Sequence, residues 1–185
     1  MKIETGKNVI TLVLTGLCTA IVCVLSVISI PLPSGVPITL QTFAVALCSY
    51  IIGFRLAPVC VIIYLALGAI GLPVFAGFSS GVGTFAHFTG GFLWGFILMA
   101  VLCGLGMRYR NKFTSIAFGL LGLLVCHLCG VIQFSAVAGM PFPESFFLAS
   151  FPYLIKDAIS VIGAYFIALA VLHALKRSRL LTVKS

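Results

Sequence analysis

Long apolar stretches, separated by short groups of polar, glycine and proline residues, dominate the pattern along this chain. In a bilayer such stretches are stable as helices, because a helix bonds all of its backbone polar groups within the segment. The sequence therefore predicts an all-α integral membrane protein with six transmembrane helices, forming one domain over residues 1–185. The six predicted segments are 9–30, 39–52, 57–70, 92–107, 113–134 and 153–175.

The second predicted segment is short. As a helix, residues 39–52 would span about 21 Å at 1.5 Å per residue, whereas the hydrocarbon core is about 30 Å thick. The preceding apolar loop, 31–37, contains three prolines and cannot be helical. Gly53 is predicted to end this segment, and Pro58 fits the first turn of the next helix.

The stretch 71–91 is the most irregular part of the chain. It combines six glycines with several phenylalanines and with the hydrogen-bonding side chains of serine, threonine and histidine. Apolar but non-helical backbone is tolerated near a membrane only where it is buried in protein or lines a cavity. We therefore interpret 71–91 as a lid.

Composition supports the membrane assignment. The chain is 62% hydrophobic and 8% charged, with a mean hydropathy of +1.28, so it cannot cover a water-facing surface. A cleaved signal peptide is disfavoured, because the first apolar run is too long and lacks a small-residue cleavage pattern. The net charge of +8 does not indicate nucleic acid, since the basic residues lie between apolar stretches rather than in one patch.

The distribution of basic residues predicts the topology. When successive ends of the six segments are assigned alternately to the two sides of the membrane, one side holds ten of the 11 Lys and Arg residues. The loops of the other side hold none. The positive-inside rule then places both termini in the cytoplasm of a multi-pass protein of the cell membrane. The ten residues are Lys2, Lys7, Arg55, Arg108, Arg110, Lys112, Lys176, Arg177, Arg179 and Lys184.

The remaining basic residue, Lys156, is followed by Asp157 near the outer start of the last segment. A charge at membrane depth costs on the order of 2.5 to 3.5 kcal/mol, so such residues usually line a cavity and have a partner. Successive helical residues diverge by about 100°, which favours contact with different parts of a ligand over a purely mutual ion pair. The alternative is that Lys156 extends to the interface while Asp157 caps backbone groups.

Other polar groups fall on the same predicted outer side. Gln41 and Thr39 lie near the start of the short second segment, where they could contact a ligand or bond a neighbouring helix. Ser79 in the lid could contact a ligand or stabilise a turn. Backbone N–H groups of Gly90 and Gly91, at a helix start, offer an alternative to Lys156 as the binding site for an anionic group of a ligand.

Four motifs give the chain a resemblance to a known family. They are the run 37–43 (PITLQTF), the run 68–77 (GAIGLPVFAG), Thr89-Gly-Gly91 followed by an aromatic residue, and the Lys156–Asp157 pair. Together they resemble BioY, the biotin-specific substrate-binding subunit (S component) of energy-coupling factor (ECF) transporters, and the similarity covers nearly the whole chain. The resemblance implies a six-helix fold, biotin capture from outside, and partnership with a transmembrane coupling subunit and a pair of ATPases.

The candidate residues suit such a ligand. The ureido ring of biotin offers two N–H donors and a carbonyl acceptor, and its chain ends in a carboxylate. We expect Asp157 to accept hydrogen bonds from the ureido N–H groups and Lys156 to bind a ligand oxygen. That oxygen is either the ureido carbonyl or one of the carboxylate oxygens. A pocket of this kind needs apolar walls. The aromatic candidates are Phe43, Phe75, Phe85 and Trp94.

A pair of small residues, Gly16 and Ala20, predicts close approach of another helix. In the S-component family, an Ala-xxx-Ala pattern on the first helix docks the coupling subunit, so the resemblance implies that role here although the first position is glycine. Gly91 and Gly95 have the same spacing. Either pair could instead pack within the subunit.

Two other functions stay open from the sequence. One is a self-sufficient biotin facilitator, although we detect none of the inverted repeats on which many secondary transporters are built. The other is a small membrane enzyme that uses Lys156 and Asp157 as acid and base.

Cys126 and Cys129 lack a second cysteine pair, so we expect no metal site, and no cofactor is expected. The glycine-rich run 77–84 lacks the lysine of a phosphate-binding loop, so ATP hydrolysis is expected on partner proteins.

Overall fold

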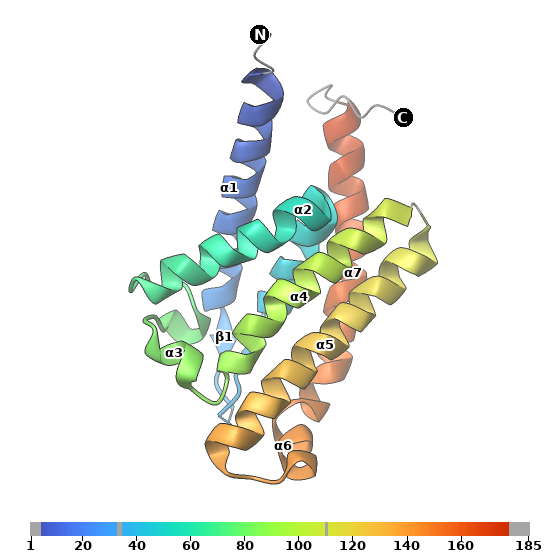
Figure 1. The fold of residues 1–185 in the computed structure, drawn as a ribbon. Helices are drawn as coiled ribbons and strands as arrows, with labels where there is room; N and C mark the ends of the chain where they lie inside the picture. Colours follow the sequence, from blue (N-terminus) through green and yellow to red (C-terminus); the bar gives the residue numbers. More distant parts are fainter. Residues whose placement is uncertain (1–4, 33–34, 110, 178–185) are drawn as a thin grey trace.

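The computed structural model describes residues 5–32, 35–109 and 111–177 and is almost entirely helical (Figure 1). Within these ranges, five helices are long and apolar enough to cross a membrane, namely α1, α2, α4, α5 and α7. The elements in chain order are α1 (Thr5–Val27), β1 (Ser29–Ile30), β2 (Ile38–Thr39), α2 (Gln41–Ala69), η1 (Ala76–Phe78), α3 (Gly83–Ala86), α4 (Gly90–Gly106), η2 (Met107–Tyr109), α5 (Lys112–Ala138), α6 (Phe142–Ala149) and α7 (Phe151–Arg177).

The second and third predicted segments form one element, α2, which is broken at Gly53. Gly53 has φ 77° and ψ 172°, a conformation that only glycine adopts readily. A Cβ placed on Gly104 of α4 would lie 2.4 Å from the backbone nitrogen of Phe54, so α4 passes directly against the break. The chain thus leaves the helical conformation where the sequence predicted a boundary, but the described residues hold five span-length helices rather than six separate ones.

Two short antiparallel strands and the helix α6 were not predicted, and the segment 71–91 contains the short helices η1 and α3. The end of the first predicted segment forms β1, which pairs with β2 in the register Ser29 with Thr39. The stretch 135–151 was predicted as a connection between helices, whereas α5 continues to Ala138 and α6 follows. Gly139, at φ 65°, ends α5 in the left-handed conformation, and Pro141 precedes the first turn of α6.

Helices α4 and α5 lie side by side (Figure 1), and their backbones approach closely at two glycines. A Cβ on Gly91 would lie 2.2 Å from the carbonyl oxygen of Cys129, and one on Gly95 would lie 2.7 Å from the Cα of Cys126. The small-residue pair on α4 therefore packs within the subunit, which was one of the two alternatives that the sequence left open.

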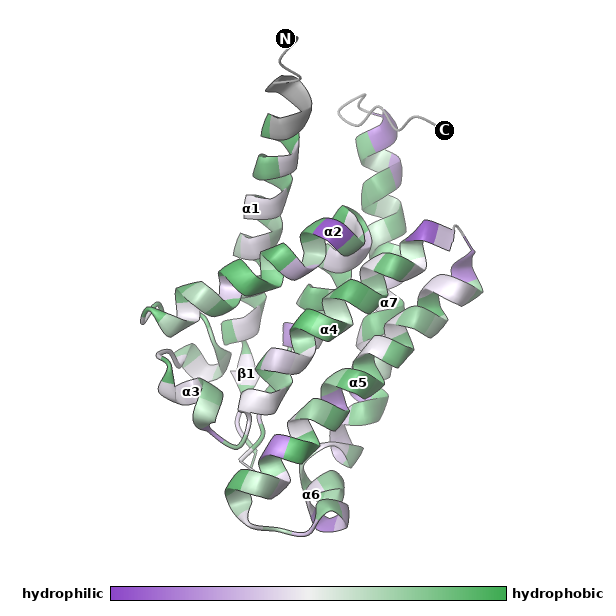
Figure 2. Ribbon diagram, in the orientation of Figure 1, coloured by the Kyte–Doolittle hydropathy of each residue, from purple (hydrophilic) through white to green (hydrophobic). Residues whose placement is uncertain are grey.

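The two ends of the molecule differ in character. The start of α1 and the end of α7 lie on the same side (Figure 1), and the connection between α4 and α5 and the break in α2 face that side. Figure 2 shows hydrophilic residues at these points, between helices that are largely hydrophobic. The strands, α3 and α6 occupy the opposite side. The strands, α3 and α6 are thus gathered away from the start of α1 and the end of α7.

Candidate ligand-binding site

A cavity of about 390 Å³ lies among the elements gathered at that opposite side. It is bounded by the β2 strand, the lid segment 71–91, the starts of α2, α4 and α7, and one turn of α5. Its lining combines aromatic rings with hydroxyl, amide, imidazole, ammonium and carboxylate groups. The lining residues are Gly35, Val36, Pro37, Thr39, Gln41, Thr42, Phe75, Ala76, Ser79, Gly83, Thr84, His87, Thr89, Phe92, Leu93, Phe96, His127, Ala149, Tyr153, Lys156 and Asp157.

Lys156 and Asp157 both reach the cavity from α7. The ammonium nitrogen of Lys156 lies 2.5 Å from Oδ1 of Asp157, so the two residues form an ion pair. Their other contacts differ, because Lys156 donates to the carbonyl oxygen of Thr39 at 2.8 Å while Asp157 contacts His127 of α5, and contact with different parts of a ligand stays a prediction. The long lysine side chain allows both contacts at once. Asp157 is buried, whereas about a third of the lysine side chain (32%) is exposed.

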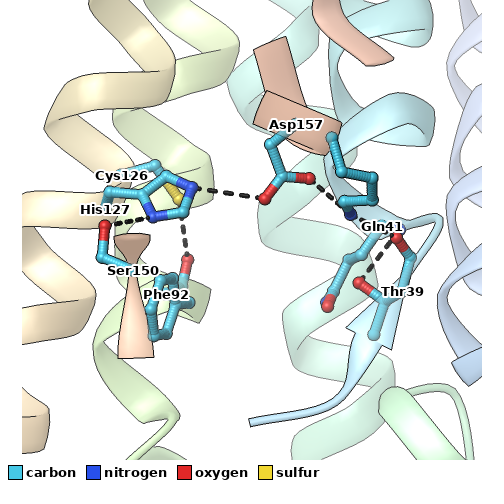
Figure 3. Close-up of polar contacts among 8 residues, drawn as sticks. Thr39, Gln41, Phe92, Cys126, His127, Ser150 and Asp157 are labelled. Carbon is cyan, nitrogen blue, oxygen red and sulfur yellow. Dashed lines mark hydrogen bonds and ion pairs between the residues drawn. The ribbon is translucent and has the colours of Figure 1, made fainter. Parts of the chain in front are cut away.

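The second oxygen of Asp157 contacts His127 of α5 (Figure 3). Oδ2 lies 3.3 Å from Nε2 of the imidazole, and Nδ1 of the same ring lies 2.8 Å from Oγ of Ser150. His127 and Asp157 are each 5% exposed, and Ser150 is fully buried at the junction of α6 and α7. The alternative in which Asp157 caps backbone groups does not describe this site, because its carboxylate is held by two side chains.

Thr39 and Gln41 bring the β2 strand and the start of α2 into the cavity wall. The Thr39 carbonyl accepts from Lys156, and its hydroxyl accepts from the backbone N–H of Gln41 at 3.3 Å. The Gln41 side-chain nitrogen donates to the hydroxyl of buried Tyr64 at 2.6 Å. The amide of Gln41 is thereby oriented by the core.

One of the predicted aromatic residues reaches the cavity, and it belongs to a chain of edge-to-face rings. Phe75 contacts Tyr64 and Phe85, with ring centroids 5.4 and 5.7 Å apart, and it lines the cavity. It fits because Gly68 of α2 has no side chain, since a Cβ there would lie 2.0 Å from the ring. Close packing of this kind fixes the ring in the wall.

The structure places five other predicted residues away from the cavity lining. Phe43 is half-buried against the main core. Phe85 and Trp94 line a separate apolar groove between α2 and α4, and Trp94 is 51% exposed. Gly90 and Gly91 are buried contacts, where a Cβ would meet the carbonyl oxygens of Phe85 and Cys129 within about 2.2 Å. Their role in this structure is close backbone packing.

Ser79 lies at the cavity in the lid, where its hydroxyl also donates to the carbonyl of Ala76 at 2.8 Å. The lid is attached to α5 by Gln133, whose side-chain nitrogen donates to the carbonyls of Phe85 and His87 at 2.6 and 2.8 Å. Both readings of Ser79, as a turn residue and as a cavity residue, are thus compatible with its position.

Sequence reasoning missed several residues of the lining. His127 was not among the predicted site residues, because no local pattern connects α5 to a residue 30 positions further along the chain. Tyr153 could have been found, since it precedes Asp157 by four residues and so lies on the same helix face. Its hydroxyl donates to the carbonyl of Val36 at 2.6 Å and so links α7 to the loop beside β2.

Gly16 and Ala20, the predicted docking pair, lie on the exposed face of α1. Within the described part of the chain, and apart from Gly16 itself, its two neighbours and the adjoining backbone of α1, no atom lies within 4 Å of a Cβ built on Gly16. The large apolar side chains of Leu12, Val13 and Leu17 are exposed beside it. This face of α1 is therefore open to lipid or to another helix.

Comparisons with known proteins agree with one another. The sequence model described as the BioY family matches residues 1–177. The biotin transporter BioY of Thermotoga maritima is 36% identical over 159 residues, covering 85% of this chain and 93% of that protein. A probable biotin transporter BioY of Pyrococcus horikoshii is 36% identical over 133 residues, covering 72% of this chain and 78% of that protein.

The fold is similar to a solved structure, described as the S-component for biotin from an ECF-type ABC transporter. The TM-score is 0.74 at 25% identity, with 96% of this chain and 95% of that chain covered. Together with the five apolar helices, these similarities identify a multi-pass membrane protein. Since the family model and the relatives each cover most of its length, the chain belongs to the BioY family.

Proposed function

We propose that this protein captures biotin at the outer face of the cell membrane, as the S component of an ATP-driven ECF transporter. The observation that carries the proposal is the cavity beside Lys156 and Asp157, in a chain of the BioY family. At about 390 Å³ it falls within the roughly 300–1,000 Å³ typical of small-molecule sites. Its mixture of apolar walls and a few polar groups suits a ligand with an apolar ring system and two polar ends.

The orientation follows from the basic residues. Described members of the basic set, such as Arg55, Lys112 and Lys176, belong to the break in α2, the start of α5 and the end of α7. These points face the side on which α1 starts and α7 ends (Figure 1), and the positive-inside rule assigns that side to the cytoplasm. The cavity then opens to the exterior. The break at Gly53 would let the two halves of α2 act as separate crossings, which gives six.

In the proposed complex, Asp157 accepts hydrogen bonds from the ureido N–H groups, and Lys156 binds a ligand oxygen. Gln41, Thr39, Phe75 and Ser79 complete the contacts, because these predicted residues line the cavity. Phe43, Phe85, Gly90, Gly91 and Trp94 are left out of the proposed contacts, since they lie in packed or lipid-facing positions. The site is thus smaller than the sequence suggested.

Transport is proposed to need partners. The exposed strip of α1 around Gly16 and Ala20 would dock a transmembrane coupling subunit, because small residues allow backbones to approach closely. A pair of ATPases would then supply the energy. A self-sufficient facilitator would differ in its behaviour, because it would move biotin across a membrane without these partners.

Calorimetric titration of the detergent-purified protein with biotin and with desthiobiotin tests the capture step. We expect saturable binding of both at one site per chain, because both carry the same ureido ring. The absence of binding to a folded protein would contradict the proposal. In proteoliposomes that contain this chain alone, we expect biotin to bind without accumulating inside, and accumulation would instead support the facilitator.

A further inference from the structure

Ser150 is connected to the candidate site through His127, although it lies outside the cavity lining. Ser150 is fully buried and does not line the cavity, yet its hydroxyl lies 2.8 Å from Nδ1 of His127. The opposite nitrogen of that ring, Nε2, lies 3.3 Å from Oδ2 of Asp157 (Figure 3). One imidazole therefore connects a serine at the α6–α7 junction to the carboxylate in the cavity wall.

The proton positions follow from the chemistry of the three groups. The ammonium of Lys156 lies against Oδ1 of Asp157, which makes the carboxylate the ionised, acceptor-only partner. Nε2 of His127 must then carry the proton that it donates to Oδ2. In the neutral ring Nδ1 is left as an acceptor, so the hydroxyl of Ser150 donates to it. A partner on one nitrogen of a histidine thus fixes what the other nitrogen can do.

The imidazole is also held mechanically. The ring of Phe92 meets it edge to face, with centroids 5.6 Å apart and planes at 89°. Phe92 itself fits against α5 because Gly130 has no side chain, since a Cβ there would lie 2.4 Å from the ring. His127 is thereby fixed by α4, by its own helix and by Ser150.

We propose that His127 is a positioning residue, which Ser150 holds in its Nε2–H form so that Asp157 presents its free acceptor sites to the N–H donors of a cyclic urea. The inference rests on the proposed function. His127 and Lys156 hold the two oxygens from opposite sides, and a carboxylate has about four acceptor sites, so sites are left for the ligand. Selectivity for ligands with N–H donors depends on that orientation.

The arrangement differs from the serine–histidine–aspartate set of hydrolases. In that set the carboxylate contacts Nδ1 and the reactive serine contacts Nε2, whereas here the order is reversed. Ser150 is also fully buried and cannot meet a substrate. The geometry therefore assigns the three residues to orientation rather than to nucleophilic chemistry.

Two substitutions of one residue separate positioning from packing. The side-chain nitrogen of H127Q can occupy the place of Nε2 and donate to Asp157, whereas the shorter side chain of H127N can reach only the place of Nδ1, next to Ser150. We expect H127Q to bind biotin within about threefold of the native protein. We expect H127N to bind at least tenfold more weakly, and to lose at least threefold of the native preference for biotin over N-methylated biotin.

The matched controls are His173→Gln and His173→Asn, made at an exposed histidine far along α7, and neither should change binding. A purely structural role, such as anchoring the α6–α7 junction, predicts the reverse order, with H127N binding more tightly than H127Q. That order, or equal affinities with an unchanged preference, would overturn the inference. Failure of the native protein to bind biotin would instead overturn the proposed function.

Ser150→Ala gives an independent test that leaves the histidine in place. We expect at least threefold weaker binding in the native background and no further loss in H127Q, because the glutamine needs no partner to fix a tautomer. Unchanged affinity of Ser150→Ala in the native background would overturn the inference, as would an equal loss in both backgrounds.

Discussion

Replacing Asp157 by alanine is the substitution whose effect follows most directly from the geometry of the site. The carboxylate is 5% exposed, and it is the only acidic side chain among the described lining residues of the cavity. Its removal would leave the N–H donors of a bound ureido ring without their acceptor, beside the Lys156 ammonium and the His127 imidazole. Hydrogen bonds to a charged group contribute about 1.5–3 kcal/mol, which corresponds to a loss of roughly 10- to 150-fold in affinity.

Calorimetry on the purified variants measures this loss. Asp157→Asn has nearly the native volume and keeps one acceptor oxygen, so we expect an intermediate affinity between the native protein and Asp157→Ala. Glu144→Gln is the matched control, because Glu144 is an exposed carboxylate of α6 outside the cavity lining, and its removal should leave binding unchanged. Native affinity in a folded Asp157→Ala protein would refute the assignment of this residue to the site.

Three further predictions concern the fold and the partner surface. Tyr64→Phe removes the acceptor of the Gln41 amide and should lower the free energy of unfolding by about 1–3 kcal/mol in a detergent stability assay, with an unchanged value contradicting that bond. Gly53→Ala should destabilise by about 1–3 kcal/mol because φ is 77° there, whereas Gly163→Ala, at an uncrowded helical glycine, should not. Gly16→Leu should leave biotin binding intact but abolish copurification with coupling proteins, and normal copurification would exclude this face of α1.

The positions of the helices could be predicted because apolar runs must be helical in a membrane and because glycine and proline interrupt them. Gly53 is the clearest case, since the sequence placed a boundary there and the structure breaks α2 at that residue. The α6 helix was missed because Pro141 and Pro143 indicate an interruption, although Pro141 can precede a short helix and Pro143 fits its first turn.

The site could be predicted only where the signal was a charge. Lys156 and Asp157 stand out because charges are rare in this chain, and the structure places both at the cavity. The aromatic residues carry no such signal. Lipid and core are equally apolar, so apolar character alone cannot distinguish Phe75, which lines the cavity, from Trp94, which lines a lateral groove. His127 depends on the packing of α5 against α7, which no local motif encodes.

The central claim is that biotin binds in the cavity beside Asp157. An experimental structure of the biotin-saturated protein tests it most directly. We predict the ureido ring within hydrogen-bonding distance of the Asp157 carboxylate, at about 2.7–3.2 Å, with the ligand enclosed by the lid segment 71–91. Biotin bound at another position, with this cavity empty, would contradict the account.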